Sequence, residues 1–168
     1  RLLISQLNPG HYVGKNYREF RSEIEKVRTG SAKVLGEIKP RGATGPLKDR
    51  IGTGYTNEER IACIWALGEI GFNQAGMDAL QNILSDNSAI IRLHTSIALV
   101  KMDNESGYNE IQTALFGKDK DLRKVAQEGL KESSYFGVPI LTRLTKLPGA
   151  QQKSLLEISR LIGDELVI

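Results

Sequence analysis

The sequence predicts an all-α protein, a right-handed α-solenoid of stacked helical hairpins. Three observations predict this fold class: an internal repeat, helical spacing of the repeated residues, and turn residues between the copies. A repeat of this length indicates that each copy is one helix–turn–helix unit and that stacking of the units buries a continuous core. The chain of 168 residues, with 40% hydrophobic and 26% charged residues, has the composition of an ordinary soluble globular protein.

The repeat is visible in four segments that begin with arginine, at Arg28, Arg60, Arg92 and Arg123. Their period of roughly 30 residues is the scale of helical-hairpin repeats. Each segment has a small residue three positions after the arginine and a leucine seven positions after it. The small residues are Ser31, Cys63, Thr95 and Ala126, and the leucines are Leu35, Leu67, Leu99 and Leu130. Offsets of three and seven lie on one face of an α-helix, so we expect both columns to be buried between helices.

Turn and capping residues divide each copy into a longer first helix and a shorter second one. Thr56 and Glu59 have the spacing of a capping box, which predicts the start of the first helix of the second copy. Gly76, Gly107 and Gly137 each precede a second apolar helical pattern, and we expect them to end the first helices.

We expect the chain to have two parts, an N-terminal loop and capping helix in residues 1–27 and the repeats in residues 28–168. The second part holds about four repeats and a partial C-terminal one. Phe20, Ile24 and Val27 lie on one face of the predicted capping helix, as expected for a helix that covers the open end of a stack. The apolar C-terminus is typical either of a docked cap or of a solenoid that continues in a larger chain.

The second copy reads RIACIWALGEIG from Arg60 and continues with DALQNILSD. These residues resemble the short HEAT-like repeat of the phycobilisome-lyase type, in which an arginine opens the first helix, small residues follow, and ALG-x-IG closes it. The resemblance extends from Arg28 to the C-terminus and is sharpest in the second copy. It implies a HEAT-like, armadillo-type superhelix that acts as a scaffold. It leaves open two alternatives, a subunit of a bilin lyase-like enzyme and a HEAT-like nucleic-acid-binding protein.

The repeated arginines Arg28, Arg60, Arg92 and Arg123 have two interpretations, a ladder that binds anions and a structural role between repeats. The structural interpretation is the simpler one, because acidic residues precede the arginines in the loops between repeats. We expect Asp86 to pair with Arg92 and Asp119 to pair with Arg123, which would fix the register between neighbouring units.

Two surfaces are candidates for binding a partner. Trp65 and Ile97 occupy a column in which other copies carry Lys33 and Glu128, so we expect both to be exposed neighbours on adjacent first helices. The alternative is that the N-terminal helix with Phe20 covers them. The second candidate surface is the polar face of the second helices, formed by Asp78, Gln81, Asn82, Asn109 and Gln112.

Few residues of the sequence suggest catalysis or metal binding. Cys63 lies in the column of small residues and is expected to be an inert packed thiol, and a lone cysteine favours a reducing, cytoplasmic location. His11 and His94 have no second ligand at metal-binding spacing. We therefore expect no catalytic residue, no metal and no cofactor.

The net charge is +3 with a sequence pI near 9.0, and basic residues alternate with acidic ones along most of the chain. This pattern differs from the clustered basic patch of nucleic-acid-binding proteins, so nucleic acid is not the expected partner. The basic residues around the first glycine-rich loop, Lys39, Arg41, Lys48 and Arg50, are expected to be solvated. The apolar runs are too short for a membrane span. The sequence thus predicts a non-catalytic interaction or regulatory module with a protein partner.

Overall fold

The computed structural model describes residues 4–5 and 20–132, and every regular element in this part of the chain is helical. The α-helices are α2 (Arg21–Ile38), α3 (Thr44–Lys48), α4 (Asn57–Ile70), α5 (Gln74–Asn82), α6 (Ala89–Lys101), α7 (Tyr108–Phe116) and α8 (Lys120–Glu132). Two short 3-10 helices, η3 (Arg41–Ala43) and η4 (Glu105–Gly107), precede α3 and α7. The predicted all-α class is therefore confirmed for the described residues.

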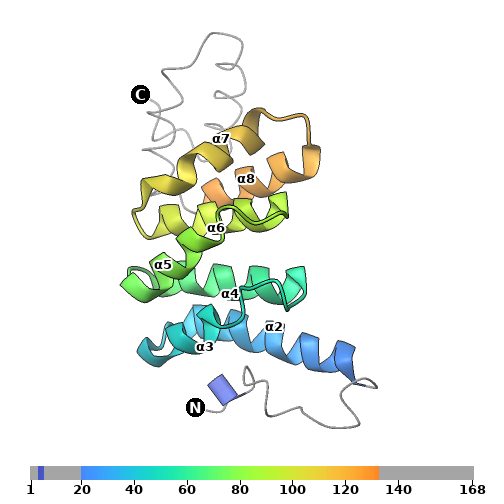
Figure 1. Ribbon diagram of the computed structural model, residues 1–168, viewed down its shortest axis with the longest axis vertical. Helices are drawn as coiled ribbons and strands as arrows, with labels where there is room; N and C mark the ends of the chain where they lie inside the picture. Colours follow the sequence, from blue (N-terminus) through green and yellow to red (C-terminus); the bar gives the residue numbers. More distant parts are fainter. Residues whose placement is uncertain (1–3, 6–19, 133–168) are drawn as a thin grey trace.

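Long and short helices alternate along the chain and form two layers (Figure 1). The long helices follow one another in space, with α2 packed on α4, α4 on α6, and α6 on α8. The short helices lie beside them, with α3 against α4, α5 against α6, and α7 against both α6 and α8. Both α4 and α6 therefore contact the long helix that precedes them and the long helix that follows.

Helix α2 is one continuous element from Arg21 to Ile38, so the predicted boundary between residues 27 and 28 falls inside a helix. The capping helix and the first repeat helix were expected to be separate, but no proline interrupts this stretch, and the two segments form one helix. Of the three residues expected on one face, Ile24 is buried, whereas Phe20 and Val27 are exposed. The predicted partial C-terminal copy lies outside the described residues.

The ends of the long helices confirm one predicted cap and correct the role of two glycines. The Thr56 hydroxyl accepts a hydrogen bond from the Glu59 backbone N–H at 3.4 Å and so caps α4. Gly76 and Gly107, however, do not end the long helices, because Gly76 lies within α5 and Gly107 in η4. Gly107 is required by close packing, since a Cβ there would lie 2.3 Å from the Ser96 carbonyl oxygen. Gly137 lies outside the described residues.

Each long helix is instead followed closely by a residue with positive φ, and these residues recur with the period of the repeat. They are Lys39, Gly71 and Asp103, with φ of 50°, 83° and 60°. The Lys39 N–H donates to the Leu35 carbonyl, and the Gly71 N–H donates to the Leu67 carbonyl, so each closes the last turn of its helix. The positive φ at these positions turns the chain toward the short helix that follows.

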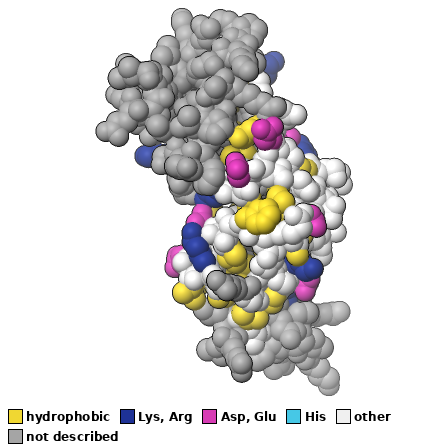
Figure 2. Space-filling model, turned by 90° about the vertical axis from the view of Figure 1, so that its left-hand side faces the viewer, with side chains coloured by type: hydrophobic (Ala, Val, Ile, Leu, Met, Phe, Trp, Pro, Cys, Tyr) yellow, Lys and Arg dark blue, Asp and Glu magenta, His cyan; other side chains and the backbone are white. Residues whose placement is uncertain are grey.

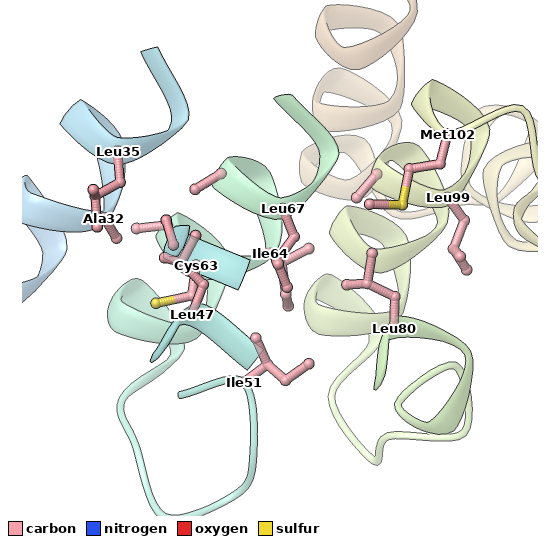
Figure 3. Close-up of a cluster of buried hydrophobic side chains, with 14 of the residues drawn as sticks. Ala32, Leu35, Leu47, Ile51, Cys63, Ile64, Leu67, Leu80, Leu99 and Met102 are labelled. Atoms are coloured by element: carbon pink, nitrogen blue, oxygen red, sulfur yellow. The ribbon is translucent and has the colours of Figure 1, made fainter. Parts of the chain in front are cut away.

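The core consists of two clusters that follow the predicted columns. In the first, side chains from α2, α3, α4, α5 and α6 meet between the layers (Figure 3). The second lies between α6, α7 and α8. All four residues of the leucine column and all four of the small column are buried. Because burial of a leucine side chain contributes roughly 1.5–3 kcal/mol, this column is a main source of stability.

Two glycines at equivalent positions of the repeat lie where the first three long helices cross. A Cβ at Gly36 would lie 2.4 Å from the Trp65 ring and 2.9 Å from the Ala66 Cα. A Cβ at Gly68 would lie 3.0 Å from the Cα of Ala98 on the next long helix. Glycine is therefore needed where α2 crosses α4 and is favoured where α4 crosses α6.

Candidate functional site

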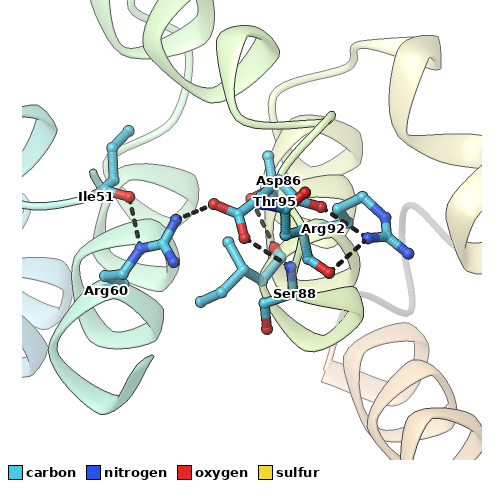
Figure 4. A network of polar contacts seen from close by, with 8 residues as sticks. Ile51, Arg60, Asp86, Ser88, Arg92 and Thr95 are labelled. Atoms are coloured by element: carbon cyan, nitrogen blue, oxygen red, sulfur yellow. Dashed lines mark hydrogen bonds and ion pairs between the residues drawn. The ribbon is translucent and has the colours of Figure 1, made fainter. Parts of the chain in front are cut away.

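The predicted arginine ladder forms contacts within the stack. The Arg60 Nε donates to the Ile51 carbonyl at 2.8 Å, and its guanidinium also pairs with the Asp86 carboxylate (Figure 4). The same carboxylate accepts from the Ser88 N–H at 2.8 Å, and the Arg60 hydrogen bond lowers the pKa of Asp86. Arg92 donates to the Asp86 backbone carbonyl at 2.7 Å. Asp86 thus links two consecutive arginines of the ladder.

This arrangement corrects the predicted pairing of Asp86 with Arg92. The Asp86 carboxylate binds Arg60 of α4 and the Ser88 N–H before α6, whereas the Arg92 Nε binds Glu110 at 2.9 Å. The pairing predicted for Asp119 is also wrong, because its carboxylate accepts the backbone N–H groups at the start of α8, from Asp121 at 2.9 Å and Leu122 at 3.1 Å.

Three of the arginines share a different feature, a hydrogen bond to a carbonyl of the preceding loop. Arg60 binds the Ile51 carbonyl, Arg92 binds the Asp86 carbonyl, and Arg123 binds the Gly117 carbonyl. A guanidinium has several donors in a fixed plane, so it can satisfy loop carbonyls and still reach a carboxylate. The ladder was expected to lock the register between units, and these contacts are consistent with that structural role.

A buried ionic cluster, for which the sequence pattern held no signal, joins α2 to α4. The Glu59 carboxylate lies 3.0 Å from Arg50 and 3.8 Å from Arg28, and the side chains of all three are at most 4% exposed. Arg50 also stacks over the Tyr55 ring at 4.7 Å. Burial raises the pKa of Glu59, and the two guanidinium groups oppose that rise. Arg50 is therefore a structural residue and not one of the solvated basic residues that were expected.

A second ionic cluster joins the ends of three long helices. Glu69 of α4 pairs with Lys39 after α2 at 3.2 Å and with Lys101 of α6 at 2.5 Å. Burial acts to raise the pKa of Glu69, but the hydrogen bonds and charges of both lysines outweigh it, so the pKa is lowered. Lys39 is consequently paired within the fold.

The long-helix layer carries a candidate binding feature, which we call the α2–α4 groove. It has a volume of about 590 Å³ and is lined by Thr29, Lys33, Glu37, Glu58, Ile61, Ala62, Trp65 and His94. A neighbouring hollow of about 390 Å³ shares Thr29, Lys33 and Glu58 with it and continues toward the start of α2. The floor is therefore apolar, with Trp65 and Ile61 half-buried, and the rim is ionic.

The two predicted apolar anchors are half-buried and pack on different neighbouring helices. Trp65 is half-buried, lines the α2–α4 groove and packs on Gly36. Ile97 is half-buried against α8, where a Cβ at Gly129 would lie 2.6 Å from its Cδ1 atom. The two residues therefore do not form the expected joint exposed patch. His94, which was not expected at a binding surface, contributes to the groove, and burial lowers its pKa.

The polar residues predicted on the second helices lie on the short-helix layer. Asp78, Gln81 and Asn82 are exposed on α5, and the Asp78 carboxylate accepts from Gln74 at 2.7 Å. Asn109 and Gln112 of α7 line a hollow of about 360 Å³ together with Thr113 and Phe116. These residues form a polar surface on a different layer from the α2–α4 groove.

The other residues considered from the sequence are the single cysteine and the histidines. Cys63 is buried, and burial raises the pKa of its thiol to about 12. Among the described residues, no three histidine, cysteine or acidic side chains are grouped to hold a metal ion. None of the described helices is long and apolar enough to cross a membrane. His11 lies outside the described residues.

Charges of both signs surround the hydrophobic side chains on the face shown in Figure 2. On that face, lysine and arginine side chains lie next to acidic ones, and the central patch is hydrophobic.

Comparisons with known proteins found no family model that matches the chain and no curated protein similar enough to count as a relative. The resemblance to the short HEAT-like repeat accordingly stays a prediction from the residues quoted above.

Proposed function

We propose that the protein is a non-catalytic protein-binding module built as a right-handed HEAT-like α-solenoid, and that it holds a segment of a partner in the α2–α4 groove. The observation that carries the proposal is the groove itself, with an apolar floor that includes Trp65 and a rim that includes Lys33, Glu37 and Glu58. Tryptophan is enriched among the residues that dominate binding energy at protein interfaces.

The recurrence of contacts supports the solenoid part of the proposal. Glycines at two helix crossings, positive-φ residues after three long helices and four buried leucines are spaced by the period of the repeat. Repeats that contact only their neighbours form extended arrays, and such arrays use their surfaces to bind partners. The polar surface of α5 and α7 would then be a second contact area.

The rim gives the groove selectivity without closing it. Lys33, Glu37 and Glu58 are exposed, and none of them forms an ion pair within the described residues. Their charges are therefore available to a partner, while the apolar floor provides the burial that stabilises the complex.

The structure gives no specific support to nucleic acid as the ligand. Arg50 is occupied by Glu59 and Lys39 by Glu69, which removes two members of the basic group around the first loop from the available surface charge. The α2–α4 groove carries two glutamates and one lysine, a poor match for phosphates. No contact among the described residues favours the bilin lyase-like alternative either.

The proposal can be tested with peptides selected from a displayed random library on the wild-type chain. Their affinity for the purified protein would be measured by calorimetry, and we expect Trp65→Ala and Thr29→Trp each to weaken binding about tenfold or more, since the first removes the floor and the second fills the groove. Phe72→Ala is the matched control, because Phe72 is 74% exposed and does not line the groove.

Thermal unfolding of each variant separates loss of binding from loss of folding. Selected peptides that bind the folded Trp65→Ala and Thr29→Trp variants as tightly as the wild type would contradict the groove as the binding site.

A further inference from the structure

Helix α2 carries an exposed apolar stripe, formed by Phe20 at its N-cap and by Val27, Val34 and Ile38. Their exposed fractions are 48%, 45%, 38% and 60%, which are unusually high for large apolar side chains in the described part of the chain. Spacings of seven, seven and four positions place them on one side of the helix. The stripe is therefore a continuous apolar surface and not a set of scattered residues.

The stripe lies on the side of α2 that faces away from α4. Gly36 marks the side that faces α4, because a Cβ there would meet Trp65 and Ala66. At about 100° per residue, Val27, Val34 and Ile38 lie roughly 160–180° around the helix from Gly36. The α2–α4 groove is lined by other residues of α2, so the stripe and the groove are separate surfaces.

In the next two copies, the position equivalent to Val34 lies at a contact between two long helices. The residues equivalent to Val34 in those copies are Ala66 and Ala98, which are both buried. Ala66 packs on Gly36 of the preceding long helix, and Ala98 packs on Gly68 of the preceding long helix. In α4 and α6, the residue equivalent to Val34 therefore contacts a glycine of the preceding long helix.

We propose that the stripe is a docking face for an amphipathic α-helix of a protein partner that carries a glycine at its crossing point with Val34. The face continues the interface by which α2 meets α4 and α4 meets α6, so the preferred occupant is a helix of the same kind. The partner helix needs a small residue there, because at the two observed crossings a Cβ on the glycine would lie within 3.0 Å of a backbone atom of the next helix. This surface goes beyond the proposed groove and does not depend on it.

The test uses the full chain with Val34→Cys and measures how fast the introduced thiol reacts with an aromatic disulfide reagent. Cys63 gives little background, since it is buried and its pKa is raised to about 12. The probe is a helix-constrained synthetic peptide with the sequence of α4, with Cys63→Ser to remove its own thiol. The matched peptide carries Gly68→Leu in addition, and Lys33→Cys on the groove side of α2 is the control protein.

We expect the thiol of Val34→Cys to react freely in the protein alone and to be slowed about tenfold by the glycine-bearing peptide at saturation. The Gly68→Leu peptide should protect it far less, and the thiol of Lys33→Cys should be unaffected by either peptide. Ile38→Cys repeats the measurement at a more exposed position if Val34→Cys does not fold.

Several results would overturn the proposal. Protection without peptide that persists on dilution would mean that the chain covers its own stripe, and protection that disappears on dilution would mean that a second copy does. Full reactivity at high peptide concentration would mean that no helix docks there. Protection of Lys33→Cys alone would place the peptide in the groove, which would contradict this inference and support the proposed function.

Discussion

The crossing of α2 with α4 and the crossing of α4 with α6 have the same backbone plan but different side chains. Each has a glycine on the earlier helix, Gly36 or Gly68, at equivalent positions of the repeat. Opposite Gly36 lie the Trp65 ring and Ala66, whereas opposite Gly68 lies Ala98. The repeated glycine sets how closely the helices approach, and the residue opposite determines whether an indole lines a groove beside the crossing.

The polar contacts at the two crossings differ even more. At the first, one carboxylate, Glu59, is shared by the buried Arg28 and Arg50. At the second, Asp86 pairs with Arg60 and binds the Ser88 N–H before α6, and its carbonyl accepts from Arg92. Equivalent units therefore share their apolar packing but satisfy their buried charges individually, and the first crossing depends more on a single side chain.

The largest expected effect is at the first crossing. Glu59→Gln would leave the guanidinium groups of Arg28 and Arg50 buried without their carboxylate, and we expect a loss of about 3–5 kcal/mol in the free energy of unfolding. Urea denaturation would measure it. Glu58→Gln, at the exposed neighbouring position, should change stability by no more than about 0.5 kcal/mol. Equal effects of the two substitutions would contradict the role given to the buried cluster.

The glycines allow the two crossings to be compared directly. Gly36→Ala should cost about 2–3 kcal/mol, because the new methyl group would meet the Trp65 ring, and Gly68→Ala should cost less, because the nearest atoms are at 3.0 Å. Emission from Trp65, the single tryptophan of the chain, should change only with Gly36→Ala. Gly30→Ala, in the same helix but facing open space, should instead stabilise the protein by about 0.5–1 kcal/mol.

The second crossing should show the clearer dependence on pH. The hydrogen bond from Arg60 lowers the pKa of Asp86, so the stabilisation is present above the unfolded-state pKa of about 3.9 and is lost as the pH falls through the lower folded value. We expect Asp86→Asn to cost about 1.5 kcal/mol at neutral pH and progressively less in acid. Urea unfolding curves of both proteins, recorded from neutral pH downward, would measure this difference in the free energy of unfolding. A difference that stays constant at every pH would contradict the role given to the Arg60–Asp86 pair.

The smallest expected effect concerns how the long helices end. Gly71 ends α4 with φ of 83°, whereas the equivalent residue after α2 is Lys39 with φ of 50°. We expect Gly71→Ala to cost about 1 kcal/mol, because a φ of 83° with a ψ of −160° is a conformation essentially restricted to glycine. Asn tolerates the αL conformation but not a positive φ combined with ψ of −160°, so Gly71→Asn should cost at least as much as Gly71→Ala in thermal unfolding. Equal melting temperatures for Gly71→Ala and the wild type would contradict the requirement for glycine at this position.

The period of the sequence was sufficient to predict the helices and much of the core. The leucine and small columns are buried as expected, and Thr56 caps α4, because these features depend on local spacing alone. The continuity of α2 was not predicted, although the lack of proline from Arg21 to Ile38 was a signal for it.

The polar partners and the groove could not be predicted in the same way. Spacing places Arg60 and Asp86 near the same junction, but the direction of a carboxylate depends on the loop that carries it. The sequence pattern indicates only a capping role for Glu59, because its partner Arg50 lies in an irregular loop outside the repeat columns. The packing of Ile97 on α8 depends on Gly129, and the other copies have no glycine at that position.

The ionic contacts also give the two sides of the stack different sensitivity to salt. Where the long helices end, Glu69 ties α2, α4 and α6 together through Lys39 and Lys101, and the Lys39 side chain is 51% exposed. Where they begin, the Arg60 and Asp86 side chains are both buried. Because mobile ions screen exposed pairs far more than buried ones, rising ionic strength should weaken the Lys39–Glu69 pair between α2 and α4 and leave the Arg60–Asp86 pair largely unchanged. The first crossing would then open slightly at the ends of α2 and α4 as salt rises, and amide hydrogen exchange in the last turn of α2 across a salt series would detect it without unfolding.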